Sequence, residues 1–128
     1  MYYFDILHNQ GEGNRVTLQV ASRFNGITFG GEEAADIFQE LSEDKVDGLT
    51  ITGAGSDPFM SRNVPLLTEL CKACKEDYPE KTIWCVTDFS FEDIKELDMI
   101  KYIDVLYSQQ RVIDVKASLK TNKIVYIN

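Results

Sequence analysis

The chain has 128 residues, enough for an apolar core, and we expect a single domain over residues 1–128. Hydrophobic residues make up 44% and charged residues 27%, and no apolar run reaches the roughly 20 residues that cross a bilayer. The net charge of −8 argues against direct nucleic-acid binding, because phosphates require clustered lysine and arginine. No secretory signal opens the chain, so a cytoplasmic protein is expected.

The first predicted elements alternate between strand and helix. Apolar residues at every second position from 16 to 20 predict a strand with one buried face. A helix is expected to open at Gly30 and Gly31 and to carry an apolar stripe as far as Leu41. The β-branched run 49–52, which follows a turn, is typical of a buried strand.

The second half of the chain continues this alternation. A helix is predicted from about Ser61 to Tyr78, followed by a strand over 83–87. Ser90 and Asp93 resemble a capping box at the start of a short helix. The remaining expectations are a strand over 103–107, a helical turn near 115–119 and an edge strand over 124–127.

This order of elements predicts the fold class. Strands that alternate with helices favour an α/β fold, here a small, open, mostly parallel sheet. About five strands are too few for a closed eight-stranded barrel.

The segment Gly53-Ala54-Gly55-Ser56-Asp57-Pro58 is the strongest candidate for a binding site. Ligands of open α/β sheets bind beyond the carboxyl ends of the strands, where such a loop lies. The glycines allow close approach to the backbone, and the carboxylate can accept from an ammonium group. The alternative is a tight strand-to-helix turn in which Asp57 or Ser61 caps the helix. The candidate ligand-binding residues are Gly53, Gly55, Ser56 and Asp57 in this loop, together with Arg111 further along the chain.

The three cysteines, Cys71, Cys74 and Cys85, form an odd number that suits a reducing compartment. Cys71 and Cys74 fall on the apolar stripe of the predicted helix 61–78, which indicates core packing rather than a redox or metal site. His8 is the sole histidine and has no accompanying nucleophile motif. We therefore expect no metal site and no catalytic residue.

Six segments in order cover most of the chain and carry a resemblance to a known family. The chain resembles the activating proteins of anaerobic ribonucleotide reductase, which are small radical-SAM enzymes. The resemblance implies a partial radical-SAM barrel, a [4Fe–4S] cluster on a CxxxCxxC loop and S-adenosylmethionine on the fourth iron. It also implies that a GGDP-type motif holds the amino group of the methionine moiety. The six segments are GEGNRVTLQV, FNGITFGGEE, GLTITGAGSDP, NVPLLTELCKACKEDYPEKTIW, TDFSFEDIKEL and QQRVIDVKASL.

The chain departs from the family pattern where the cluster loop belongs. Val20 is followed by Ala21-Ser22-Arg23-Phe24, without the thiolates that such a cluster requires. The GGDP motif is enlarged to residues 53–58, and the stretch after Ser108 is shortened. We therefore expect a catalytically inactive pseudoenzyme without a cofactor. It is expected to bind an unidentified protein partner as a regulator or inhibitor, including as a phage-type anti-defence (anti-CRISPR-like) factor.

Two alternatives stay open. The chain could retain S-adenosylmethionine or nucleotide binding in the cleft of residues 53–58, or it could regulate anaerobic ribonucleotide reductase. An active enzyme with rebuilt chemistry ranks last. Neither nucleic acid nor a membrane is an expected partner, and a twofold homodimer is the default form of self-association.

Overall fold

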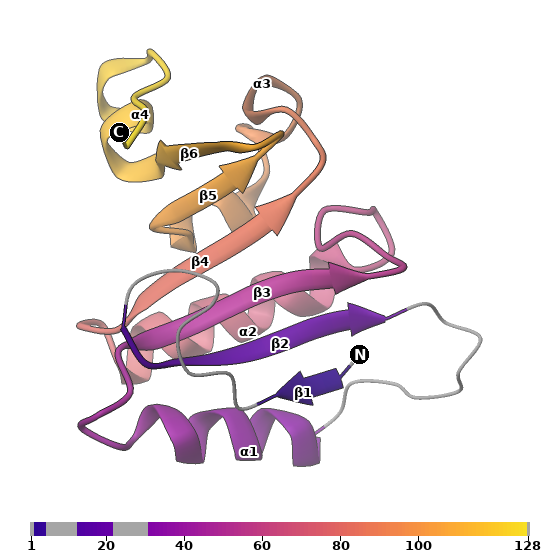
Figure 1. The fold of residues 1–128 in the computed structure, drawn as a ribbon, viewed down its shortest axis with the longest axis vertical. Coiled ribbons are helices and arrows are strands. Elements are labelled where there is room, and N and C mark those ends of the chain that lie inside the picture. The colour runs from indigo at the N-terminus through magenta and orange to yellow at the C-terminus, as the bar shows by residue number, and fades with distance from the viewer. Residues whose placement is uncertain (1, 5–12, 22–30, 128) are drawn as a thin grey trace.

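The computed structural model describes residues 2–4, 13–21 and 31–127. Its centre is a six-stranded sheet in which the strands lie side by side in chain order (Figure 1). The inner strands β2 to β5 are parallel, and β1 and β6 pair antiparallel at the two edges. The expected α/β class with a small, open, mostly parallel sheet is therefore confirmed. The strands are β1 (Tyr2–Phe4), β2 (Arg15–Ala21), β3 (Gly48–Ala54), β4 (Thr82–Thr87), β5 (Val105–Ser108) and β6 (Arg111–Asp114).

Helical segments connect the parallel strands. Helix α1 follows β2, α2 follows β3, and the short α3 with the 3₁₀ helix η2 follows β4 (Figure 1). Within the described ranges, no helix has the length and apolar character needed to span a membrane. The helical segments are α1 (Gly31–Leu41), α2 (Val64–Asp77), α3 (Phe91–Ile94), η2 (Asp98–Tyr102) and α4 (Val115–Thr121).

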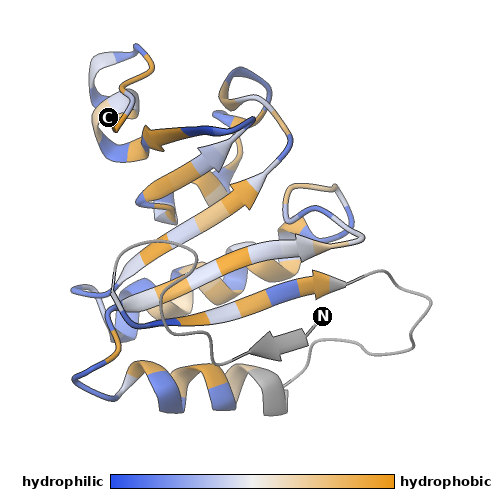
Figure 2. Ribbon diagram, in the orientation of Figure 1, coloured by the Kyte–Doolittle hydropathy of each residue, from blue (hydrophilic) through white to orange (hydrophobic). Residues whose placement is uncertain are grey.

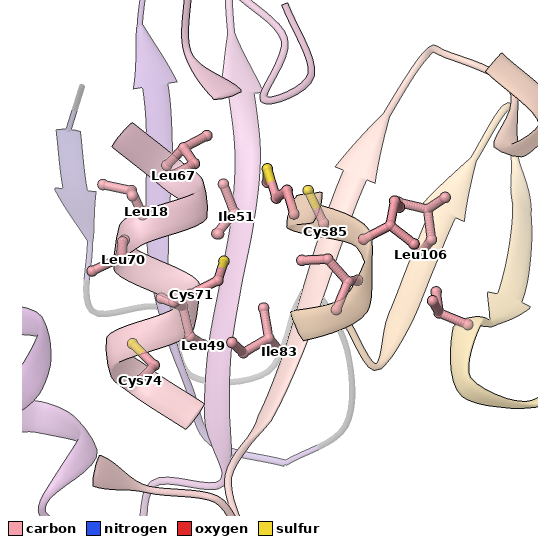
Figure 3. Packing of buried hydrophobic residues seen from close by; sticks show 14 of the residues in the cluster. Leu18, Leu49, Ile51, Leu67, Leu70, Cys71, Cys74, Ile83, Cys85 and Leu106 are labelled. Atoms are coloured by element: carbon pink, nitrogen blue, oxygen red, sulfur yellow. The ribbon is translucent and has the colours of Figure 1, made fainter. Parts of the chain in front are cut away.

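The core lies between one face of the sheet and the helices. Successive strand residues point to opposite faces, so Ile83 and Cys85 of β4 are buried while Trp84 between them is half-buried. Helix α1 carries alternating hydrophobic and hydrophilic segments, and its Ile37 and Leu41 are buried (Figure 2). Figure 3 shows the centre of this core, where α2 packs against the sheet. Its labelled members are Leu18, Leu49, Ile51, Leu67, Leu70, Cys71, Cys74, Ile83, Cys85 and Leu106.

Several element boundaries differ from the sequence predictions, and the strand expected over 103–107 spans Val105–Ser108. Helix α2 begins at Val64 rather than near Ser61, because residues 57–63 first form turns in which the Asn63 amide donates to the Met60 carbonyl at 2.8 Å. The predicted edge strand over 124–127 is reduced to one bridge, between Ile113 and Tyr126.

The chain also forms a hairpin that the sequence analysis did not predict. Strands β5 and β6 are joined by Gln109 and Gln110, whose φ angles are +50° and +67°. Two consecutive left-handed residues form the tight turn that suits a hairpin, but such turns normally contain Asn or Gly. The pair of glutamines therefore carried no turn signal. By contrast, the predicted cap at Ser90 is confirmed, since its side chain accepts from the Asp93 amide.

A buried arginine ties three strands together at their amino ends. Arg15 of β2 is 2% exposed, and its Nε donates to Thr50 Oγ1 of β3 at 2.9 Å. Its two terminal nitrogens donate to Thr82 Oγ1 at 2.9 Å, to the Thr82 carbonyl at 2.7 Å and to the Leu49 carbonyl at 2.9 Å. Gly48 leaves room for this group, because a Cβ there would lie 2.6 Å from Arg15 Nη2.

Replacing this arginine tests its importance for stability. Arg15→Met keeps an apolar stem but removes charge-assisted hydrogen bonds inside the sheet, so we expect the free energy of unfolding to fall by about 3 kcal/mol. The matched control is Arg111→Met, since Arg111 is exposed and stacks on Tyr126 at the sheet edge. Urea unfolding of both variants measures the difference, and equal losses would contradict this assignment.

Candidate functional site

A cavity of about 450 Å³ lies at the carboxyl ends of β3 and β4. Its walls come from the end of β3, the loop that follows it and the end of β4. This is the edge at which ligands of open parallel sheets bind. Four of the five predicted site residues, Gly53, Gly55, Ser56 and Asp57, line this cavity together.

Asp57 joins the loop after β3 to the end of β4. Its Oδ1 accepts from the Phe59 amide at 2.9 Å and from the Thr87 hydroxyl at 2.7 Å. Its Oδ2 accepts from the Asp88 amide at 2.9 Å. The carboxylate therefore holds two neighbouring strand ends at a defined spacing. One acceptor direction of Oδ2 is not used by these three contacts, because each carboxylate oxygen can accept twice.

The loop itself is braced from α2. Asn63, at the start of that helix, is 9% exposed and donates through Nδ2 to Ser56 Oγ at 3.0 Å and to the Asp57 carbonyl at 2.8 Å. The Ser56 oxygen also accepts from Arg62 Nη2 at 3.5 Å, and the Ser56 hydroxyl donates to the Met60 sulfur at 3.5 Å, a weak acceptor. The Ser56 oxygen is thus fixed in place, and its proton is held only weakly.

Both glycines of the loop are required by its geometry. A Cβ on Gly53 would lie 1.9 Å from the Ser56 carbonyl oxygen, so no side chain fits there. Gly55 has a φ of +84°, in the left-handed region that favours glycine. The loop forms a tight turn, but neither Asp57 nor Ser61 caps α2, whose N-cap is Asn63 without a side-chain hydrogen bond. Ligand binding by this loop stays a prediction.

Arg111 does not join the other four predicted residues. It pairs with Ser108 on β5, two strands away from β3, and its guanidinium carbon lies 3.9 Å from the centre of the Tyr126 ring. Thr52, Thr87 and Asp88 line the cavity but were not predicted. The position of Thr87 at the end of the predicted strand 83–87 was the available signal, since neighbouring parallel strands end at one edge of the sheet.

A second, larger cavity of about 650 Å³ lies at the opposite ends of the strands. Arg15, Thr82 and Trp84 contribute to its walls. The polar atoms of Arg15 and Thr82 are already hydrogen-bonded to each other across the strands. We therefore place the candidate site at the Asp57 loop, where the polar groups converge on open space.

The sequence of the chain was compared with known proteins. The sequence model of the family described as "4Fe-4S single cluster domain" matches residues 14–123. An anaerobic ribonucleoside-triphosphate reductase-activating protein of Pasteurella multocida is 31% identical over 126 residues, which cover 82% of this chain and 77% of the relative. The chain belongs to this family of activating proteins.

Further relatives carry the same name. The protein of Enterobacteria phage T4 is 39% identical over 82 residues, 64% of this chain and 51% of the relative, so the chain matches about half the length of that protein. The Haemophilus influenzae protein is 27% identical over 122 residues, 82% of this chain and 77% of the relative. No solved structure matches the chain.

These findings correct two predictions. The relatives are named activating proteins, which contradicts the expectation of a catalytically inactive regulator or inhibitor, including an anti-defence factor. The expectation that the chain is not an enzyme is contradicted by the same names and by the 4Fe-4S family model. The absence of the cysteine loop indicates which atoms can bind iron. It does not indicate the process in which the chain acts. The prediction was wrong because it inferred an inhibitor from the missing iron ligands.

The cysteines of this chain do not fit the cluster that the family name implies. Cys71, Cys74 and Cys85 are free thiols, 0%, 3% and 0% exposed, and none of them lines the cavity beside Asp57. Within residues 2–4, 13–21 and 31–127, no group of three or more His, Cys, Asp or Glu side chains is arranged to hold a metal ion.

A conservative substitution tests the role of Asp57 in the loop. Asp57→Asn places an NH₂ group against one of the three donors that now face the carboxylate, so we expect a loss of about 1–3 kcal/mol in the free energy of unfolding. Asp88→Asn is the matched control, because the adjacent exposed side chain undergoes the same change of charge. Urea denaturation of both variants provides the measurement. An unchanged midpoint for Asp57→Asn would show that the carboxylate does not stabilise the connection between the loop and the end of β4.

Proposed function

We propose that this chain acts in the activation of an anaerobic ribonucleoside-triphosphate reductase and binds that enzyme directly. The observation that carries the proposal is the match over 82% of the chain to a relative named for this activation. The net charge of −8 supports docking to a basic surface of the reductase. A single domain over residues 1–128 and a cytoplasmic location are part of the same proposal.

The proposal includes S-adenosylmethionine as the ligand of the cavity beside Asp57. A volume of about 450 Å³ suits a small molecule, and the walls combine glycine backbone with hydroxyl and carboxylate groups. The ammonium and sulfonium groups of S-adenosylmethionine are cationic, so the carboxylates of Asp57 and Asp88 complement them. Among the described residues that line this cavity there is no lysine or arginine, although Arg62 Nη2 lies 3.5 Å from Ser56 Oγ, so it is the two carboxylates that favour a cationic ligand.

Each cavity residue has a distinct part in this proposal. Gly53 and Gly55 allow the ligand to approach the backbone, and the Ser56 hydroxyl can donate to the ligand carboxylate. The free acceptor direction of Asp57 Oδ2 can receive the ligand ammonium group. Arg111 lies outside the cavity and stacks on Tyr126, so the small-molecule proposal rests on the other four residues.

The role in activation is tested with the anaerobic reductase encoded in the same genome as the chain. The two purified proteins are mixed without oxygen, together with S-adenosylmethionine and a reductant. We expect a complex in sedimentation velocity, and a gain in deoxyribonucleotide formation only when a protein that holds the [4Fe–4S] cluster is also present. A reductase that does not bind the chain would refute the proposal.

Ligand binding is tested separately by calorimetric titration of the chain with S-adenosylmethionine. Ser56→Ala removes the hydroxyl that donates to the ligand carboxylate in this proposal, so we expect binding to weaken several-fold. Ser42→Ala is the matched control, because that hydroxyl donates to the Gln39 carbonyl at the end of α1. If the unmodified chain gives no heat at millimolar ligand, or if both variants bind alike, the cavity is not the binding site.

A further inference from the structure

The family model of this chain is named for a single 4Fe-4S cluster, and iron–sulfur clusters are held by cysteine thiolates. The chain has three cysteines, and all three lie in its described part. Whether they can serve as ligands therefore depends on where the three side chains lie and on how readily they ionise.

The three thiols lie inside the hydrophobic core and not at the edge of the sheet. Cys71 and Cys74 occupy the buried stripe of α2, and Cys85 belongs to β4 within the same core cluster (Figure 3). Cys85 is on the same face of β4 as Thr87, which lines the cavity, but Cys85 is two residues further from the strand end, is 0% exposed and does not line the cavity itself. A cluster bound to these thiols would have to displace the apolar side chains that surround them.

The surroundings of each thiol also oppose ionisation. Burial raises the pKa of Cys74 to about 12, and the carboxylate of Asp77 adds to this effect. Burial likewise raises the pKa of Cys71 well above the ordinary range, and Cys74 and Asp104 raise it further. Burial also raises the pKa of Cys85, and Cys71 and Asp57 add to this increase. Lys75 acts in the opposite direction on the pKa of Cys71 and Cys74, but it offsets only part of the increase. The thiol form is therefore favoured at all three positions.

We infer that residues 1–128 hold no iron–sulfur cluster and that their cysteines are core residues. Any [4Fe–4S] cluster that takes part in the activation must then be held by thiolates outside this segment. This inference concerns the ligands alone and goes beyond the proposed function, because the chain can bind the reductase in either case.

The test is anaerobic reconstitution of the chain with ferrous iron and sulfide, followed by desalting. We expect less than one iron per chain and no visible charge-transfer absorbance. The matched variant carries Cys71→Ala, Cys74→Ala and Cys85→Val, and we expect the same iron content as in the unmodified chain. About four irons per chain, lost in the variant, would overturn the inference. Four irons retained in the variant would overturn it as well, by locating other ligands within residues 1–128.

Thiol labelling of the unmodified chain provides a second measurement, which does not depend on the folding of the variant. The ordinary thiol pKa is 9.0 and that of Cys74 is about 12, so its thiolate fraction at pH 8 is about a thousandfold lower than in the unfolded chain. We expect the three thiols to react slowly in the native protein and immediately in denaturant. A native thiol that reacts as fast as the denatured one would contradict the core assignment. Neither measurement uses the reductase, so its outcome is separate from that of the activation assay.

Discussion

The carboxylate of Asp57 joins the two strand ends between which the candidate cavity lies. Parallel strands bring the loops after β3 and β4 to one edge of the sheet, but the ladder of hydrogen bonds ends before these loops begin. The contacts of Asp57 to the Thr87 hydroxyl and to the Asp88 amide continue the connection beyond the ladder. The width of the cavity therefore depends on one side chain rather than on the sheet alone.

The opposite end of the sheet is held by a polar group of opposite sign. Arg15 reaches from β2 to β3 and β4 and is buried with its hydrogen bonds. Between these two ties the sheet packs against α2 through apolar side chains, including the three thiols (Figure 3). This division places the polar loops at one edge and the apolar core beneath, as is usual for α/β binding sites.

Membership of the activating-protein family and the position of the cysteines point in different directions. The relatives connect the chain with activation of a reductase, whereas the thiols of this chain are buried in surroundings that raise their pKa. The two observations are compatible when the role in activation and the ligands of the cluster are treated as separate properties. The error in the sequence analysis was to infer an inhibitor from missing ligands.

Much of the fold was predictable because its signals are local. The buried strand before Gly53, the helical stripe that contains Cys71 and Cys74, and the cap at Ser90 each depend on spacing within a few residues. The turn at Gln109 and Gln110 carried no such signal, because glutamine rarely occupies left-handed positions. The hairpin strand β6 was missed for the same reason.

The sequence by itself determined the α/β class, the burial of the cysteines and the glycine loop, since each follows from periodicity or from backbone requirements. Only the tertiary structure decided that Asp57 bonds to the end of β4, that Thr52, Thr87 and Asp88 share its cavity, and that Arg111 lies on β6, three strands from β3. These residues are far apart along the chain. Their proximity depends on strand order and register. These arise from packing of the whole sheet and cannot be read from the sequence pattern of any short segment.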